Sequence, residues 1–82
     1  MIVTWDEPKR LANLARHGLD FASLNVAFFL ASTIVPAGRG RHMAIGLFGD
    51  APVSVVFRVL GSEALAVISM RRASRQERRL IR

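Results

Sequence analysis

The pattern of hydrophobic and polar positions changes period about halfway along the chain, from helical spacing to alternation. In the first half, Leu11 and Leu14 recur at helical spacing. They follow Asp6, a residue type that favours helix N-caps, and precede Gly18, the residue type most common just after a helix ends. The pattern therefore predicts a helix from about residue 7 to residue 17.

A second helix is predicted after Asp20, which repeats the capping device. In the segment "FASLNVAFFLA", residues 21–31, the side chains of Phe21, Leu24 and Phe28 share one helical face. We expect that face to pack against the core.

The segments on either side of these helices have different compositions. "MIVTW", residues 1–5, is rich in β-branched and aromatic residues and predicts a short strand. "STIVPAGRGR", residues 32–41, contains two glycines and a proline. It therefore predicts a loop, with at most a brief extended piece at residues 33–35.

The second half contains three apolar runs, "HMAIGLFG" (42–49), "PVSVVFRVL" (52–60) and "ALAVISM" (64–70). The short segments between them, "GDA" and "GSE", suit tight hairpin turns, so the runs predict an antiparallel meander. Alternation along the middle run makes one face wholly apolar and directs Arg58 to the other.

A short basic helix is predicted at the end of the chain. Ser74 and Glu77 are three residues apart, as in a capping box, which marks a helix start. Like charges at spacings of three and four repel, and a protein tolerates this more readily when an anion lies across them. The arginines with this spacing share one face of the predicted helix: Arg75, Arg78, Arg79 and Arg82.

The positive charge is concentrated at the same end. The chain has 82 residues and a net charge of +6. Residues 71–82 contain six arginines against one glutamate, a net +5. Guanidinium groups form paired hydrogen bonds to phosphate and carboxylate, so the composition indicates a polyanion partner, either a nucleic acid or an acidic protein. The alternative is that the arginines simply solvate a small domain.

The cysteine and histidine content and the apolar runs argue against a metalloprotein, an exported protein and a membrane protein. The chain has no cysteine, and its two histidines, His17 and His42, are far apart with no nearby carboxylate pattern, so we expect no metal and no cofactor. The amino terminus lacks the features of a signal peptide, and the longest apolar run, residues 26–31, is too short to span a membrane. We expect a cytoplasmic protein.

Basic residues are sufficient for one kind of catalysis. In RNA cleavage the 2′-hydroxyl of the substrate can be the nucleophile, which leaves the protein to orient the strand, move protons and stabilise the charged phosphate. Lys9 and His17, on the first helix, are candidates for assisting proton transfer. The alternatives are that His17 interacts with the last carbonyls of its helix and that Lys9 lies on a solvated face.

The segment "WDEPKRLANLARHGLDF", residues 5–21, resembles the W-D-x-x-K-x-x-x-N-x-x-K-H-G-x-x-F signature of BrnT-type toxins. "RHMAIG" and "ISMRRASRQERR" resemble later blocks of that family, in the same order. The signature positions that match are Trp5, Asp6, Lys9, Asn13, His17, Gly18 and Phe21, with Arg16 in place of the usual lysine.

The resemblance implies a single BrnT-like toxin domain over residues 1–82. It implies an α+β, RelE-like fold with two N-terminal helices, a three- to four-stranded antiparallel sheet and a short C-terminal basic helix. The implied activity is that of a metal-independent endoribonuclease which cleaves RNA and inhibits translation. A cognate BrnA-type antitoxin would neutralise the toxin, and the toxin would reach operator DNA only through that antitoxin.

The expected site residues are basic. For phosphate binding and catalysis they are Lys9, His17, Arg58, Arg71 and Arg72, and for further RNA contacts they are Arg41, Arg75, Arg78 and Arg79.

The sequence also departs from the family pattern. Leu60 and Ala66 occupy positions that are commonly arginine in the family, and Ile81 occupies a position that is commonly tyrosine. These departures keep a second hypothesis open, a weakened or inactive relative that binds an antitoxin or a nucleic acid. A free-standing DNA-binding protein is the third reading, and it lacks a helix-turn-helix pattern.

Overall fold

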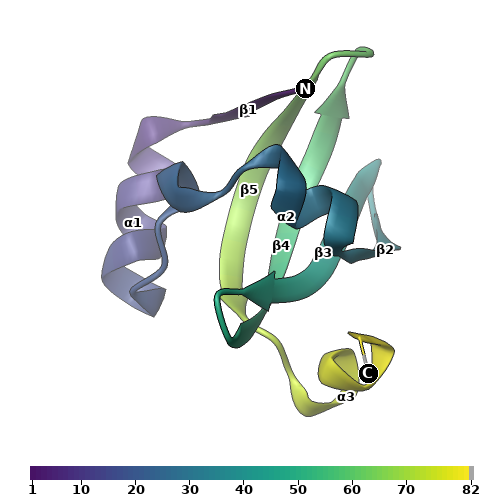
Figure 1. Cartoon of the computed structure of the whole chain (residues 1–82). Coiled ribbons are helices and arrows are strands. Elements are labelled where there is room, and N and C mark those ends of the chain that lie inside the picture. Colours follow the sequence, from purple (N-terminus) through teal and green to yellow (C-terminus); the bar gives the residue numbers. More distant parts are fainter. Residues whose placement is uncertain (82) are drawn as a thin grey trace.

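The computed structural model describes residues 1–81, and its centre is one five-stranded sheet (Figure 1). Arg82, which the sequence placed on the arginine face of the last helix, lies outside the described residues. The strand order is β1-β5-β4-β3-β2. The strands are β1 (Ile2–Trp5), β2 (Thr33–Gly38), β3 (Arg41–Phe48), β4 (Ala51–Leu60) and β5 (Ala64–Arg72).

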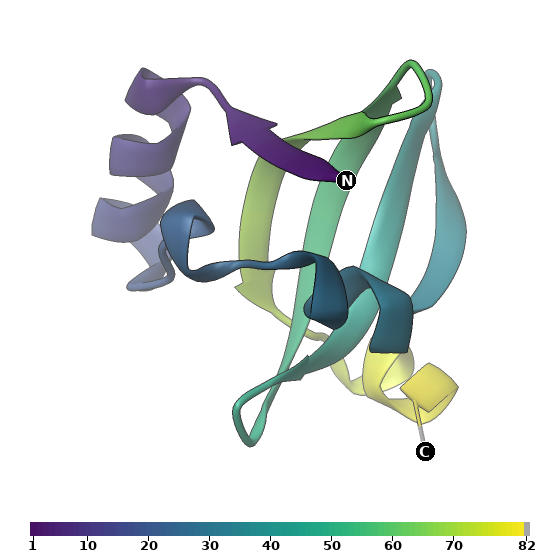
Figure 2. The ribbon, with the colours of Figure 1, turned by 45° about the horizontal axis from the view of Figure 1, so that its top comes forward.

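Short helices surround the sheet on different sides. In Figure 2, α1 lies beside the sheet, η1 and α2 cross one face, and the C-terminal helices lie at one end. The helices are α1 (Glu7–His17), the 3₁₀ helix η1 (Phe21–Ser23), α2 (Val26–Ala31), α3 (Arg75–Arg78) and the 3₁₀ helix η2 (Arg79–Ile81).

The predicted limits of the first helix are confirmed. The Asp6 side chain accepts a hydrogen bond from the backbone N–H of Lys9, and Pro8 lies in the first turn, where a missing N–H costs nothing. At the other end Gly18 adopts φ 69°, and its N–H bonds to the carbonyl of Leu14. Both ends of α1 therefore lie where the sequence placed them.

The second predicted N-terminal helix does not form as one unit, which corrects the expected fold. Asp20 caps only η1, and Leu24 is extended. Asn25 then starts α2 as a new N-cap, because its side-chain oxygen accepts the N–H of Phe28 at 3.1 Å. Side chains of this kind offer backbone groups an alternative to a continuous helix.

The prediction of a three- to four-stranded antiparallel sheet was also wrong, because a strand is added at each edge. β1 pairs with β5 in parallel, which makes the sheet mixed. β2 pairs with β3 where a loop with only a brief extended piece at residues 33–35 was expected. Pro36 is tolerated there because β2 is an edge strand, and the register shifts between Pro36 and Gly38. The meander of β3, β4 and β5 is as predicted.

The core lies between η1, α2 and one face of the sheet. Alternation along β4 buries Val53, Val55 and Phe57 on this face. Phe29 of α2 meets Phe57 edge to face, with ring centroids 5.3 Å apart. We call the face of the sheet that packs against η1 and α2 the covered face. Phe21, at the start of η1, is fully buried in the same cluster.

The other face of the sheet, the open face, is covered only at one end. Ile45 and Ser54 are neighbours on adjacent strands and are both buried there. The Ser54 hydroxyl donates a hydrogen bond to Glu77 of α3 at 2.8 Å, so the C-terminal helices shield this end. The opposite end of the open face carries Arg58, which is exposed.

Candidate functional site

A hollow with basic side chains lies at the exposed end of the open face, where β4 ends and β3 begins. Its volume is about 180 Å³. We call it the basic hollow. The side chains that line it come from the start of α1 and from three strands: Asp6, Lys9, Arg41, Arg58, Leu60, Ala66, Val67 and Ile68.

Strand register brings two of these arginines together. His42 pairs with Phe57 across β3 and β4, so Arg41 and Arg58, the next residues outward, are cross-strand neighbours. Like charges in this relation destabilise a sheet. Both arginines line the hollow, and neither has a salt bridge within residues 1–81. The pair therefore presents positive charge without a bonded counter-ion to the hollow.

Helix α1 supplies one cation and one carboxylate from its first turn. Asp6 is the N-cap, and Lys9 lies three residues later, so both side chains are close to the end of β1. The sequence analysis gave Asp6 a capping role and a place in the family signature, but did not include it among the expected site residues. The adjacency of Asp6 to the end of the β1 strand was the available signal, but the parallel pairing of β1 was not predicted.

The position of α1 depends on Asn13, which is buried rather than solvated. Its side-chain oxygen accepts the N–H of Met70 at 3.1 Å, and its amide donates to the carbonyl of Leu19 at 3.0 Å. Beyond Trp5, β1 no longer pairs with β5, so backbone groups on this edge of β5 lack a strand partner. Asn13 provides the acceptor for one of them, the N–H of Met70. The side chain thus fixes α1, and with it Lys9, against the sheet.

A cluster of charged side chains, Arg10 with Glu7 and Asp20, holds the first turn of α1 in place. Arg10 bonds to both Glu7 and Asp20, and the Trp5 indole N–H donates to Glu7. The Arg10 guanidinium, followed by Trp5, lowers the pKa of Glu7 to about 2. The N–H of Ala22 and then Arg10 lower the pKa of Asp20. Arg10 is therefore engaged within the fold.

The two positions at which the sequence resemblance led us to expect arginine, Leu60 and Ala66, line the basic hollow. Ala66 is the direct cross-strand partner of Arg58, and Leu60 is two residues further along β4 on the same face. An arginine at either position would therefore lie beside Arg58.

Arg71 and Arg72 do not line the basic hollow. Arg71 forms two hydrogen bonds to Glu77, at 2.7 and 2.9 Å, and joins β5 to α3. Arg71, together with the N–H of Ser74 and the hydroxyl of Ser54, lowers the pKa of Glu77 to about 2. Arg72 is the next residue on the strand, so it points to the covered face.

His17 is also separated from the hollow. It is the last residue of α1, two turns after Lys9, which corresponds to about 12 Å along the helix axis. His42 lies on the covered face, with its ring centroid 5.8 Å from that of Phe57. Within residues 1–81 no three histidine, aspartate or glutamate side chains are grouped as a metal site.

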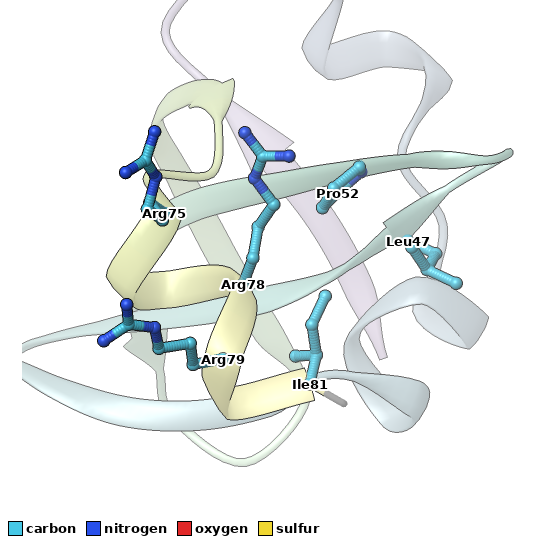
Figure 3. Close-up of a pocket in the computed structure, with 6 residues that line it drawn as sticks. All are labelled: Leu47, Pro52, Arg75, Arg78, Arg79 and Ile81. Atoms are coloured by element: carbon cyan, nitrogen blue, oxygen red, sulfur yellow. The ribbon is translucent and has the colours of Figure 1, made fainter.

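The remaining predicted arginines line a second, larger hollow at the other end of the open face (Figure 3). Its volume is about 650 Å³. We call it the C-terminal groove. It is lined by Arg75, Arg78, Arg79 and Ile81 from the C-terminal helices and by Leu47 and Pro52 from the β3–β4 hairpin.

Comparisons with known proteins place these features in a family. The family model described as "Ribonuclease toxin, BrnT, of type II toxin-antitoxin system" matches residues 5–77. A solved structure of the Brucella abortus ribonuclease toxin, BrnT, is 53% identical, with a TM-score of 0.86. The match covers 92% of this chain and 99% of that one.

No curated protein matches the chain. Within the described part of the chain, every helix is too short or too polar to cross a membrane. The match over residues 5–77 and the similarity to the solved toxin together show that the chain belongs to the BrnT family of ribonuclease toxins of type II toxin–antitoxin systems.

Proposed function

We propose that this toxin cleaves RNA in the basic hollow, by attack of the substrate's own 2′-hydroxyl and without a metal ion. One observation carries the proposal. Lys9, Arg41 and Arg58 come from three separate elements and line one hollow together with the carboxylate of Asp6. A phosphate in the hollow would supply the counter-charge that Arg41 and Arg58 lack among the described residues.

The proposed reaction assigns a role to each of these groups. The 2′-oxygen attacks phosphorus, the bond from phosphorus to the 5′-oxygen breaks, and the products are a 2′,3′-cyclic phosphate and a 5′-hydroxyl. Asp6 accepts the proton of the 2′-hydroxyl, and the Lys9 ammonium donates a proton to the leaving 5′-oxygen. Arg41 and Arg58 stabilise the negative charge that develops on the phosphate oxygens.

Membership of the family supports the wider role that we propose. Cleavage of cellular RNA in the cytoplasm would stop translation, and a cognate BrnA-type antitoxin would neutralise the toxin. Operator DNA would be bound only through that antitoxin. We treat residues 1–82 as a single toxin domain, because one sheet and one core account for all the described elements.

The test is cleavage of a 5′-labelled RNA by purified protein in EDTA. We expect cleavage with cyclic-phosphate ends, and no cleavage of the same sequence made as DNA. Arg41→Ala and Arg58→Ala should each slow cleavage by about 100-fold or more, as removal of a transition-state donor does elsewhere. Arg16→Ala, an exposed arginine on α1, is the matched control and should keep the wild-type rate. Intact RNA at high protein concentration would refute the proposal.

A second candidate function is a weakened toxin that acts mainly as a binding module. It is favoured by Leu60 and Ala66, which leave the hollow with fewer guanidinium groups than the family pattern implies. Expression in bacteria separates the two functions. Growth arrest that the antitoxin relieves supports the ribonuclease, whereas harmless expression with a stable antitoxin complex supports the binding module.

A further inference from the structure

The C-terminal groove has an aliphatic floor that continues beyond its rim. Leu47 is 60% exposed and lines this groove and two adjoining hollows, which extend over Ala31 to α2. Leu80, 52% exposed, and Ile81 line one of the adjoining hollows as well. Contiguous exposed apolar surface of this kind marks interaction sites.

The rim of the groove is cationic. Arg75, Arg78 and Arg79 are exposed, and none of them has a salt bridge within residues 1–81. Figure 3 shows Arg78 and Ile81 on the side of the helix that faces the hairpin, whereas Arg75 lies beyond Arg78 and Arg79 points away from the hairpin. The one acid of α3, Glu77, is occupied by Arg71, Ser54 and Ser74. The three arginines therefore repel one another without an internal counter-charge.

We propose that the C-terminal groove docks an acidic, amphipathic segment of the antitoxin, with carboxylates on the arginine rim and apolar side chains over Leu47 and Ile81. The inference rests on the antitoxin partner of the proposed function. Guanidinium groups pair bidentately with carboxylates. An aliphatic floor complements the apolar face of a peptide helix laid in a groove.

The floor of the groove favours a peptide over RNA. RNA is held chiefly by cations on its phosphates, which would leave an aliphatic floor without a role. The floor of the C-terminal groove consists of Leu47, Pro52 and Ile81, which suit the apolar face of a peptide helix.

The two hollows are far enough apart to act separately. Both lie on the open face, and Arg41 and Leu47 mark the two ends of β3. Leu47 is six positions after Arg41 along the extended strand, which corresponds to about 20 Å. An antitoxin segment in the C-terminal groove is thus distinct from a phosphate in the basic hollow.

The test measures two activities on the same variants. The antitoxin encoded beside the toxin is titrated calorimetrically into the full chain, and RNA cleavage is measured in parallel. The groove variants are Arg75→Glu combined with Arg78→Glu, and Leu47→Ser. The controls are Arg16→Glu combined with Arg39→Glu, which makes the same change in net charge, and Leu11→Ser, a leucine of α1 that is 52% exposed. Circular dichroism confirms that each variant folds.

The proposal predicts that both groove variants bind the antitoxin about 100-fold more weakly, the loss typical of central interface residues. The sequence predicted RNA contacts for Arg75 and Arg78, and the proposal reassigns both to the antitoxin. RNA cleavage by the groove variants should therefore stay within about twofold of wild type, and both controls should bind normally. Unchanged antitoxin affinity in the groove variants overturns the proposal, and so does loss of RNA cleavage, which would make the groove an RNA surface. A wild-type chain that binds antitoxin but cleaves no RNA refutes the proposed function alone.

Discussion

Replacing Glu77 by glutamine is expected to loosen α3 from the sheet. The carboxylate is largely buried, with 17% of the side chain exposed. It accepts hydrogen bonds from Arg71, Ser54 and the N–H of Ser74, all at 2.7 to 2.9 Å. Glutamine keeps the shape of the side chain but removes the charge that orders these donors.

The lowered pKa of Glu77 gives the size of the expected change in the free energy of unfolding. It falls from 4.5 to about 2 in the folded chain, chiefly because of Arg71. At about 1.4 kcal/mol per pKa unit, the ionised carboxylate stabilises the fold by about 3 kcal/mol at pH 7. Because the folded pKa is the lower one, this stabilisation is complete above the unfolded pKa and is lost as the pH falls toward the folded pKa. Linkage leaves about 1.4 kcal/mol at pH 3.

The assay is urea unfolding of wild type and Glu77→Gln at pH 7 and pH 3, followed by circular dichroism. We expect a loss of about 2 to 3 kcal/mol at pH 7 that falls to less than half at pH 3. Glu63→Gln, in the exposed turn before β5, is the control and should change the free energy of unfolding little. A Glu77→Gln loss that is equal at both pH values would refute the reasoning.

Three further substitutions test other parts of the structure. Asn13→Ala leaves the N–H of Met70 without its acceptor and should cost about 1 to 3 kcal/mol; hydrogen exchange at Met70 should accelerate, and unchanged exchange would contradict this role. Gly46→Ala brings a methyl group against the Ser32 hydroxyl and should cost about 1 to 3 kcal/mol in urea unfolding. Ser32→Ala in the same chain should recover part of that loss, and an undiminished loss counts against the clash. Ala66→Arg adds a guanidinium to the basic hollow and should speed RNA cleavage, whereas a rate at or below wild type speaks against the assigned geometry.

Local signals predicted the local features well. The cap residues Asp6 and Gly18 marked the ends of α1, and Ser74 with Glu77 marked the start of α3 by a capping box that forms in the structure. The two short turns gave the β3-β4-β5 meander. Each of these features depends on residues close together in sequence, whose backbone preferences act directly.

The errors in the fold came from distant pairing and from one competing cap. The parallel partner of β1 is more than sixty residues away in the sequence. The glycines and the proline of residues 32–41 are typical of a loop, but pairing with the edge of β3 makes part of this segment a strand. Asn25 divided the second helix because its side chain outcompeted helix continuation. Composition and periodicity carry no information about which edge a strand will join.

The candidate site was predicted in part. Lys9, Arg41 and Arg58 were among the expected residues, and they line one hollow. Arg71 and Arg72 are adjacent in sequence but point to opposite faces, which strand alternation implies once β5 is known to include both. Asp6 was named as a signature position but not as a site residue, because its capping role already explained it.

The most direct test of the central claim compares single-turnover cleavage of one labelled RNA by Arg58→Ala and Arg72→Ala. Arg58 lines the basic hollow, whereas Arg72 points to the covered face of the sheet. The account predicts that Arg58→Ala loses about 100-fold or more in rate and that Arg72→Ala cleaves nearly as fast as wild type. The reverse order of rates, with Arg58→Ala active and Arg72→Ala inactive, would contradict it and place the chemistry elsewhere.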